Sequence, residues 1–173
     1  MSVTTSTIVS QPAYQLGAVV LLGGIASIVT ALGFEHLGGY WPCPLCLQQR
    51  YAYYFAIPVG FGALVLLGAG YGRVAAILMI TVALAYLINT GLGIRHAGVE
   101  WGFWEGPSTC SGAPSLSGNA GGLLGKLAQE KPVIRCDEAS WRFLGLSFAG
   151  WNAVISLGLC ALAARAARDM RLS

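Results

Sequence analysis

Residues 74–94 read VAAILMITVALAYLINTGLGI, and this run of 21 residues contains no charged side chain. A helix of about 20 apolar residues spans the hydrocarbon core of a bilayer. Two other uncharged stretches, 51–72 and 143–164, are similar in length, and residues 1–34 carry no charge either. The sequence therefore predicts four transmembrane helices, near 14–34, 47–68, 74–94 and 147–167.

The overall composition agrees with a membrane protein. Hydrophobic residues make up 55% of the chain and charged residues only 10%, whereas soluble domains carry roughly 25% charged residues. The first span lacks a basic flank and a cleavage site for signal peptidase, so we expect it to remain in the protein. We predict an all-α membrane protein, a four-transmembrane-helix bundle forming a single integral membrane domain over residues 1–173. No basic run suggests nucleic-acid binding.

Four of the five cysteines fall in two predicted loops, near 35–46 and 95–146. With an even number of spans, both termini lie on one side of the membrane and the first and third loops lie on the other. Cys43 and Cys46 end the first loop, and Cys110 and Cys136 lie in the long loop between the third and fourth spans. Both pairs are therefore expected to face the same compartment, whatever the orientation.

Orientation follows from charge and from redox chemistry. Arg73 lies in the very short second loop, and Arg165, Arg168 and Arg171 follow the last span. Basic residues at these places favour a cytoplasmic location for both termini. Cysteines that cycle as disulfides belong in an oxidising compartment, which also makes the long third loop extracytoplasmic.

The segment WPCPLCLQQR, residues 41–50, joins the first loop to the second span. Proline is tolerated in the first turn of a helix, so Cys46 is expected near the helix N-terminus, where the dipole and free N–H groups favour a thiolate. Arg50 follows four residues later on the same face. A cation at the hydrocarbon boundary needs a partner or a function, such as stabilising a thiolate or holding a carbonyl oxygen of a bound ring. The alternative is that Arg50 extends to the lipid headgroups.

Each thiol also has a plainer interpretation. Cys43 and Cys46 could form half of a zinc site or a local structural disulfide, but the chain has no second close-spaced pair, and we expect no metal site. Cys110 and Cys136, if bonded, could be a structural staple or an exposed, exchanging disulfide. Cys160, inside the last span, is expected to be a packing residue. His96 is either a solvated histidine at the interface or a contact for a ligand at headgroup depth.

Three blocks along the chain carry a resemblance to a known family: WPCPLCLQQR, FWEGPSTCSG and IRCDEASWRFLGLSFAGW. In order and spacing they resemble the DsbB family, the disulfide bond formation protein B of bacterial inner membranes. The resemblance implies an electron route. A reduced periplasmic thiol oxidase like DsbA would attack Cys110, and the freed Cys136 would exchange with Cys43. Cys46 would then act on a bound quinone, with Arg50 beside it and His96 near the ring.

The same resemblance implies the setting of the reaction. The expected location is the bacterial inner (cytoplasmic) membrane, with the thiol loops facing the periplasm. The expected partners are a DsbA-like thiol oxidase, the membrane quinone pool and the lipid bilayer, and the acceptor would be ubiquinone or menaquinone. Gln48 and Gln49 stand where the best-known member has a tyrosine and an acid, which bears on quinone contacts. The alternative function is a non-catalytic four-helix membrane scaffold or carrier whose loop disulfides are structural.

Overall fold

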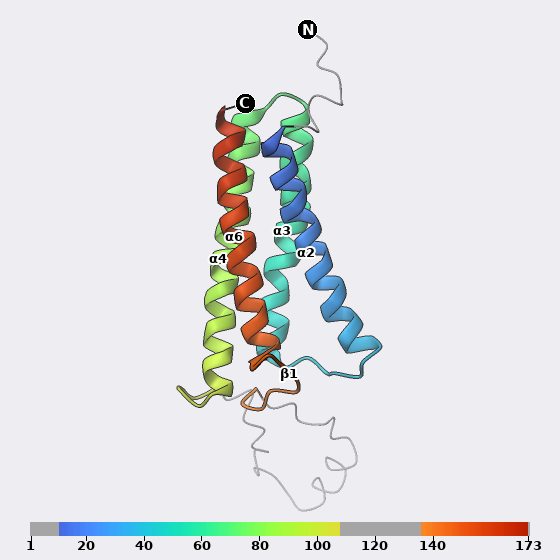
Figure 1. Ribbon diagram of the computed structural model, residues 1–173, viewed down its shortest axis with the longest axis vertical. Coiled ribbons are helices and arrows are strands. Elements are labelled where there is room, and N and C mark those ends of the chain that lie inside the picture. The colour runs from blue at the N-terminus through green and yellow to red at the C-terminus, as the bar shows by residue number, and fades with distance from the viewer. Residues whose placement is uncertain (1–10, 108–135, 173) are drawn as a thin grey trace, which may run out of the picture.

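The computed structural model describes residues 11–107 and 136–172 of the chain. Within these ranges lie four long helices and one short β-hairpin: α2 (Pro12–His36), α3 (Pro44–Gly68), α4 (Gly72–Glu100), β1 (Arg142–Phe143), β2 (Leu146–Ser147) and α6 (Phe148–Leu172). All four helices are long and apolar enough to cross a membrane. Figure 1 shows them side by side, with α2 beginning and α6 ending at the same end of the bundle. The predicted four-helix membrane bundle is confirmed.

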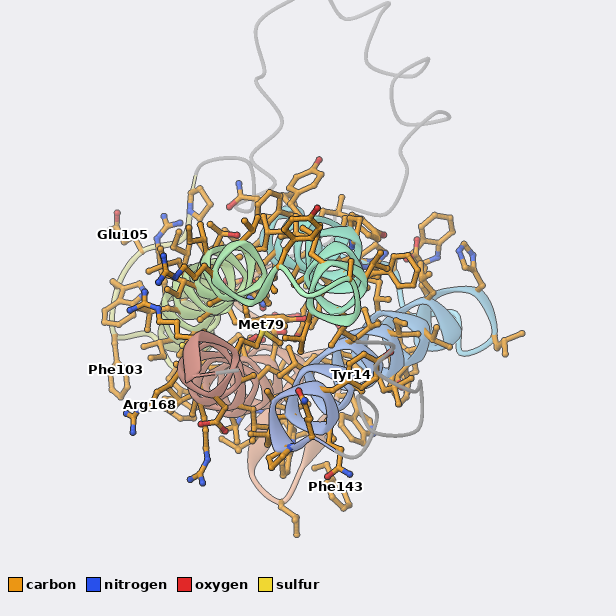
Figure 2. The ribbon with its side chains drawn as sticks, turned by 90° about the horizontal axis from the view of Figure 1, so that it is seen from above. Tyr14, Met79, Phe103, Glu105, Phe143 and Arg168 are labelled. Carbon is orange, nitrogen blue, oxygen red and sulfur yellow. The ribbon has the colours of Figure 1, made fainter. Side chains whose placement is uncertain are left out.

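The helices follow a closed order, because α2 packs on α3, α3 on α4, α4 on α6, and α6 on α2. Met79 lies fully buried in the middle of the four helices, as Figure 2 shows from above. Large apolar side chains also cover the outer surface of the bundle, including Leu22, Phe61, Ile88 and Leu157, each more than half exposed. A soluble bundle would have charged residues on these faces, so the outer surface fits a lipid environment and a multi-pass membrane protein.

The third helix is longer than the sequence predicted. Residues 95–100, placed at the start of the long loop, continue α4 by more than a turn. No proline interrupts this stretch, and the helix ends before Gly102, which has a φ of +73°. Beyond that turn, Trp104 Nε1 donates to the carbonyl oxygen of Arg95 at 2.7 Å. The extension matters because it makes His96 a helical residue with a fixed direction.

Helices α4 and α6 approach closely at a pair of small residues. A Cβ atom on Gly93 would lie 3.0 Å from both the Cβ and the backbone nitrogen of Ala153, and 3.1 Å from the carbonyl oxygen of Ala149. Small residues of this kind let helices in lipid pack backbone to backbone.

Replacing Gly93 with valine is therefore expected to destabilise the protein. The added methyl groups meet backbone atoms of α6 that cannot move aside, and overpacking of this kind costs about 1–3 kcal/mol. Thermal unfolding in detergent measures the effect. Gly91→Val is the matched control, because a Cβ there meets no atom within 4 Å. Equal unfolding temperatures for the two variants would contradict the close packing of α4 on α6.

Candidate functional site

A cavity of about 550 Å³ opens at the end of the bundle where α2 ends and α3 begins. Figure 1 shows α2 leaning away from the other three helices at this end. The volume lies within the usual range for small-molecule sites, roughly 300–1,000 Å³. Eight phenylalanine, tyrosine and tryptophan residues line the cavity: Phe34, Tyr40, Trp41, Tyr53, Trp141, Phe143, Phe148 and Trp151. Among them the rings of Trp141 and Phe148 stack at 4.9 Å, so the wall suits a flat apolar ligand.

Cys43 and Cys46 are free thiols that both line this cavity. Cys43 is the N-cap of α3, and its Sγ accepts the backbone N–H of Cys46 at 3.1 Å. The sequence predicted that the helix N-terminus would favour a thiolate at Cys46. In the structure the sulfur of Cys43 accepts the helix N–H instead, because an N-cap side chain accepts from the residue two or three positions later. The hydrogen bond from the Cys46 side chain, with a further one from His96, lowers the pKa of Cys43 to about 5, although burial acts in the opposite direction.

This lowered pKa predicts an unusual pH dependence for alkylation of reduced Cys43. Only the thiolate reacts, so the rate should be nearly constant above about pH 6 and fall about tenfold per pH unit below pH 5. An ordinary cysteine instead titrates near 8.5. The rate is measured with a small neutral alkylating reagent and mass spectrometry, with unfolded protein as the control. A Cys43 rate that still climbs between about pH 7 and pH 9 would contradict the assignment.

His96 is buried, with 3% of its surface exposed. Its Nε2 lies 3.6 Å from Cys43 Sγ and 3.7 Å from Glu100 Oε1, and its Nδ1 lies 2.9 Å from Gln49 Nε2. The interpretation of His96 as a solvated interfacial residue is therefore wrong, because the extended α4 turns the ring inward. The chain's other histidine, His36, is exposed.

Arg50 lies on the cavity wall one turn beyond Cys46. Its Nη1 pairs with Oε2 of Glu35 at 2.5 Å, which ties the start of α3 to the end of α2. The arginine side chain is only 13% exposed, so it is held at the cavity by this partner rather than extended to the headgroups. Sequence reasoning did not find Glu35 as the partner.

The other cysteines lie in different surroundings. Cys136 is disulfide-bonded and 1% exposed, in a buried cluster with Cys43, Leu45 and Val99. This cluster brings Cys136 of the second pair against Cys43 of the first. Cys110 lies outside the described residues. Cys160 packs half-buried against the main hydrophobic core, as expected for a packing residue.

A buried chain of polar side chains, which sequence reasoning missed, continues from His96 into the bundle. Its members come from α3, α4 and α6 and are joined by hydrogen bonds of 2.6–3.3 Å: Gln49, Tyr53, Asn89, Asn152 and Ser156. A spacing signal was present, because Gln49 and Tyr53, and likewise Asn152 and Ser156, are four residues apart and share a helix face. Polar residues inside membrane spans usually have a function.

Three groups at the site could bind a metal ion, since ligand atoms of Cys43, Cys46 and His96 lie within 4.8 Å of one another. The zinc site considered from the sequence was built from cysteines alone and did not include His96. Two thiols that line an aromatic cavity, beside a buried cysteine that is disulfide-bonded, can exchange with that disulfide and can also donate electrons to a flat ligand.

Comparison with known proteins places this geometry in a family. Residues 14–166 match the family described as "Disulfide bond formation protein DsbB". A protein named disulfide bond formation protein B from Aromatoleum aromaticum is 33% identical over 77% of this chain and 81% of its own length. One with the same name from Polaromonas naphthalenivorans is 31% identical over 90% of this chain and 93% of its own. No solved structure matches the chain.

Proposed function

Since the chain belongs to the DsbB family of disulfide bond formation proteins and has a disulfide-generating role, we propose that it oxidises a soluble DsbA-like dithiol protein and passes the electrons to a membrane quinone. The overall reaction converts a protein dithiol and a quinone into a protein disulfide and a quinol, with two electrons and two protons transferred. The observation that carries the proposal is a free dithiol, Cys43 and Cys46, which lines an aromatic cavity and packs against disulfide-bonded Cys136.

The proposed electron route consists of two thiol–disulfide exchanges. A thiolate of the reduced partner attacks the sulfur of Cys110 in a Cys110–Cys136 disulfide, which releases Cys136. The partner's second thiol then displaces Cys110 and leaves the partner oxidised. The freed pair, led by Cys136, reduces a Cys43–Cys46 disulfide. The burial of Cys136 beside Cys43 supports this second exchange, and the low pKa of Cys43 makes it a good leaving group.

The cavity residues fit a quinone. When bound, a quinone supplies the terminal oxidation, since it takes up the two electrons and two protons of the inner dithiol. Aromatic side chains would hold its ring, and Arg50 would donate a hydrogen bond to a carbonyl oxygen at the cavity wall. Cys46, half-buried and facing the cavity, would be the thiol nearest the acceptor, while buried Cys43 faces the disulfide. His96 would hold the sulfur of Cys43.

We also propose the orientation and location that the charges favour. The site lies at the end of the bundle opposite the start of α2 and the end of α6 (Figure 1). The basic residues Arg165, Arg168 and Arg171 lie at that other end of α6, which favours a cytoplasmic position for it. The thiols then face the periplasm from the inner membrane, where a soluble dithiol partner can reach them.

Arg50→Ala tests the proposal at the quinone step. We expect quinone reduction, measured anaerobically with the purified protein and a reduced partner, to fall about tenfold to a hundredfold, since a hydrogen bond to a charged group contributes about 1.5–3 kcal/mol. Exchange with the partner, measured without quinone, should change little. Arg73→Ala, at the opposite end of the bundle, is the matched control. Equal loss of both half-reactions would mean that Arg50 acts only through the fold. A protein that never consumes quinone would be the non-catalytic scaffold instead.

A further inference from the structure

The buried polar chain has a direction, because each side-chain amide donates on one side and accepts on the other. Asn89 Nδ2 lies 2.8 Å from Ser156 Oγ and 3.3 Å from Asn152 Oδ1. The hydroxyl of Tyr53 donates to the same Asn152 oxygen at 2.7 Å. Since this oxygen accepts two hydrogen bonds, the NH₂ group of Asn152 points the other way and donates to Gln49 Oε1 at 2.6 Å.

Gln49 passes this direction on to His96. Its oxygen is occupied by Asn152, so its NH₂ group faces Nδ1 of His96 at 2.9 Å. Nδ1 must then accept and carries no proton, which leaves the ring proton on Nε2. Nε2 lies 3.6 Å from Cys43 Sγ and 3.7 Å from Glu100 Oε1. A sulfur and a carboxyl oxygen can both accept, so the groups at this end of the amide chain also favour a donor at Nε2.

The reversed arrangement is unfavourable at both ends. If the three amides were turned over, the NH₂ group of Asn89 would point where its Oδ1 now lies, a buried position with no hydrogen-bond partner among the described residues. A buried NH₂ with two unpaired donors costs more than one unpaired oxygen. At the other end, Nε2 would direct its lone pair at the sulfur of Cys43 and at a carboxyl oxygen of Glu100.

We propose that the amide chain Asn89–Asn152–Gln49 holds His96 as its Nε2–H tautomer, so that the ring donates to the sulfur of Cys43 and is prevented from ligating a metal ion. The ligand atoms of Cys43, Cys46 and His96 are close enough for a thiophilic ion such as Zn²⁺. A histidine ligates a metal through an unprotonated ring nitrogen. The amide chain keeps a proton on Nε2, the ring nitrogen that faces the thiols.

The amide chain would thus protect the dithiol from metal binding as well as position His96. A bound divalent ion would occupy both thiolates and stop their oxidation, whereas a hydrogen bond to Cys43 leaves them free. This consequence for turnover rests on the proposed function. The tautomer itself and the exclusion of metal do not, so they can be tested without quinone. Gln49, Asn152 and Asn89 are positioning residues in this scheme, because they act through His96.

The tautomer is tested by ¹⁵N NMR of the reduced full-length protein with labelled histidine. The chain has two histidines, and exposed His36 is an internal reference. We expect His96 to show a protonated Nε2 and an unprotonated Nδ1 at neutral pH. A proton on Nδ1 would overturn the proposal. A protein with the expected tautomer that reduces no quinone would contradict the proposed function and leave this assignment standing.

Metal exclusion is tested with Cd²⁺, whose bonds to thiolates are detected by their absorbance. The protein carries Cys110→Ser and Cys136→Ser, so that Cys43 and Cys46 are the thiols beside His96. Adding Asn152→Leu, or in a second variant Gln49→Met, should tighten Cd²⁺ binding about tenfold, the size of effect seen for outer partners of metal-ligating histidines.

The matched control is Thr90→Val, because the buried hydroxyl of Thr90 donates only to the carbonyl oxygen of Tyr86 on its own helix. This variant should bind Cd²⁺ as weakly as its parent. Unchanged Cd²⁺ affinity in both the Asn152 and Gln49 variants would overturn the exclusion of metal. So would tight binding in the parent protein, whose amide chain is intact.

Discussion

Replacing Cys46 with serine is expected to abolish catalytic quinone reduction, with a loss on the order of a thousandfold or more, as for other variants that lack an essential nucleophile. A serine hydroxyl cannot form a disulfide with Cys43, so the inner pair has no oxidised form to regenerate. Cys46 is also the half-buried thiol of the pair and lines the aromatic cavity. Quinone consumption is measured anaerobically, with purified protein and excess reduced partner.

The same variant should still oxidise the partner once. Its loop disulfide at Cys136 does not depend on Cys46, so about one equivalent of partner dithiol is expected to be oxidised before the reaction stops. Cys160→Ser is the matched control, since that thiol packs in the core away from the cavity, and it should turn over like the parent protein. Continued quinone consumption by the Cys46 variant would disprove the assignment of Cys43 and Cys46 as the quinone-facing dithiol.

The sequence alone predicted the four helices, and it placed Cys136 on the same side as Cys43 and Cys46, where the structure has it beside Cys43. Uncharged runs of the right length are a strong signal, because in lipid a helix is one of the few structures that satisfy the hydrogen bonds of the polar backbone. The parity of the spans then places the loops. The N-terminus of α3 was also readable, since prolines flank Cys43 and proline is favoured in the first turn of a helix.

The rotation of each helix could not be predicted in the same way. Lipid and the bundle interior are both apolar, so an apolar span does not reveal which of its faces points inward. The ion pair of Arg50 with Glu35 depends on that rotation, and so does the contact between Gln49 and Asn152, residues 103 positions apart. The burial of His96 was missed for a local reason, because six residues assigned to the loop continue α4.

A second large effect is expected for Cys136→Ser, which should accumulate a disulfide-linked adduct with the soluble partner in its oxidised form. The free thiol of Cys110 attacks the partner's disulfide, and one sulfur of the partner leaves as a thiol. In the parent protein, the thiol of Cys136 can attack the disulfide between Cys110 and the partner and release the partner. An intramolecular thiol of this kind acts at high effective concentration. Serine cannot make that attack. We expect at least about tenfold more adduct than in the parent protein, detected by mass spectrometry after acid quenching and lost on reduction.

Burial of Cys136 makes this prediction specific to Cys110. With 1% of its surface exposed and a position beside Cys43, Cys136 is poorly placed to meet a soluble protein, and its natural exchange partner is the inner pair. The reciprocal variant, Cys110→Ser, should therefore trap no partner, although it leaves Cys136 as a thiol. An adduct on Cys136 in that variant would show that the two loop cysteines are interchangeable, and the ordered route from the partner through Cys110 and Cys136 to Cys43 would then be wrong.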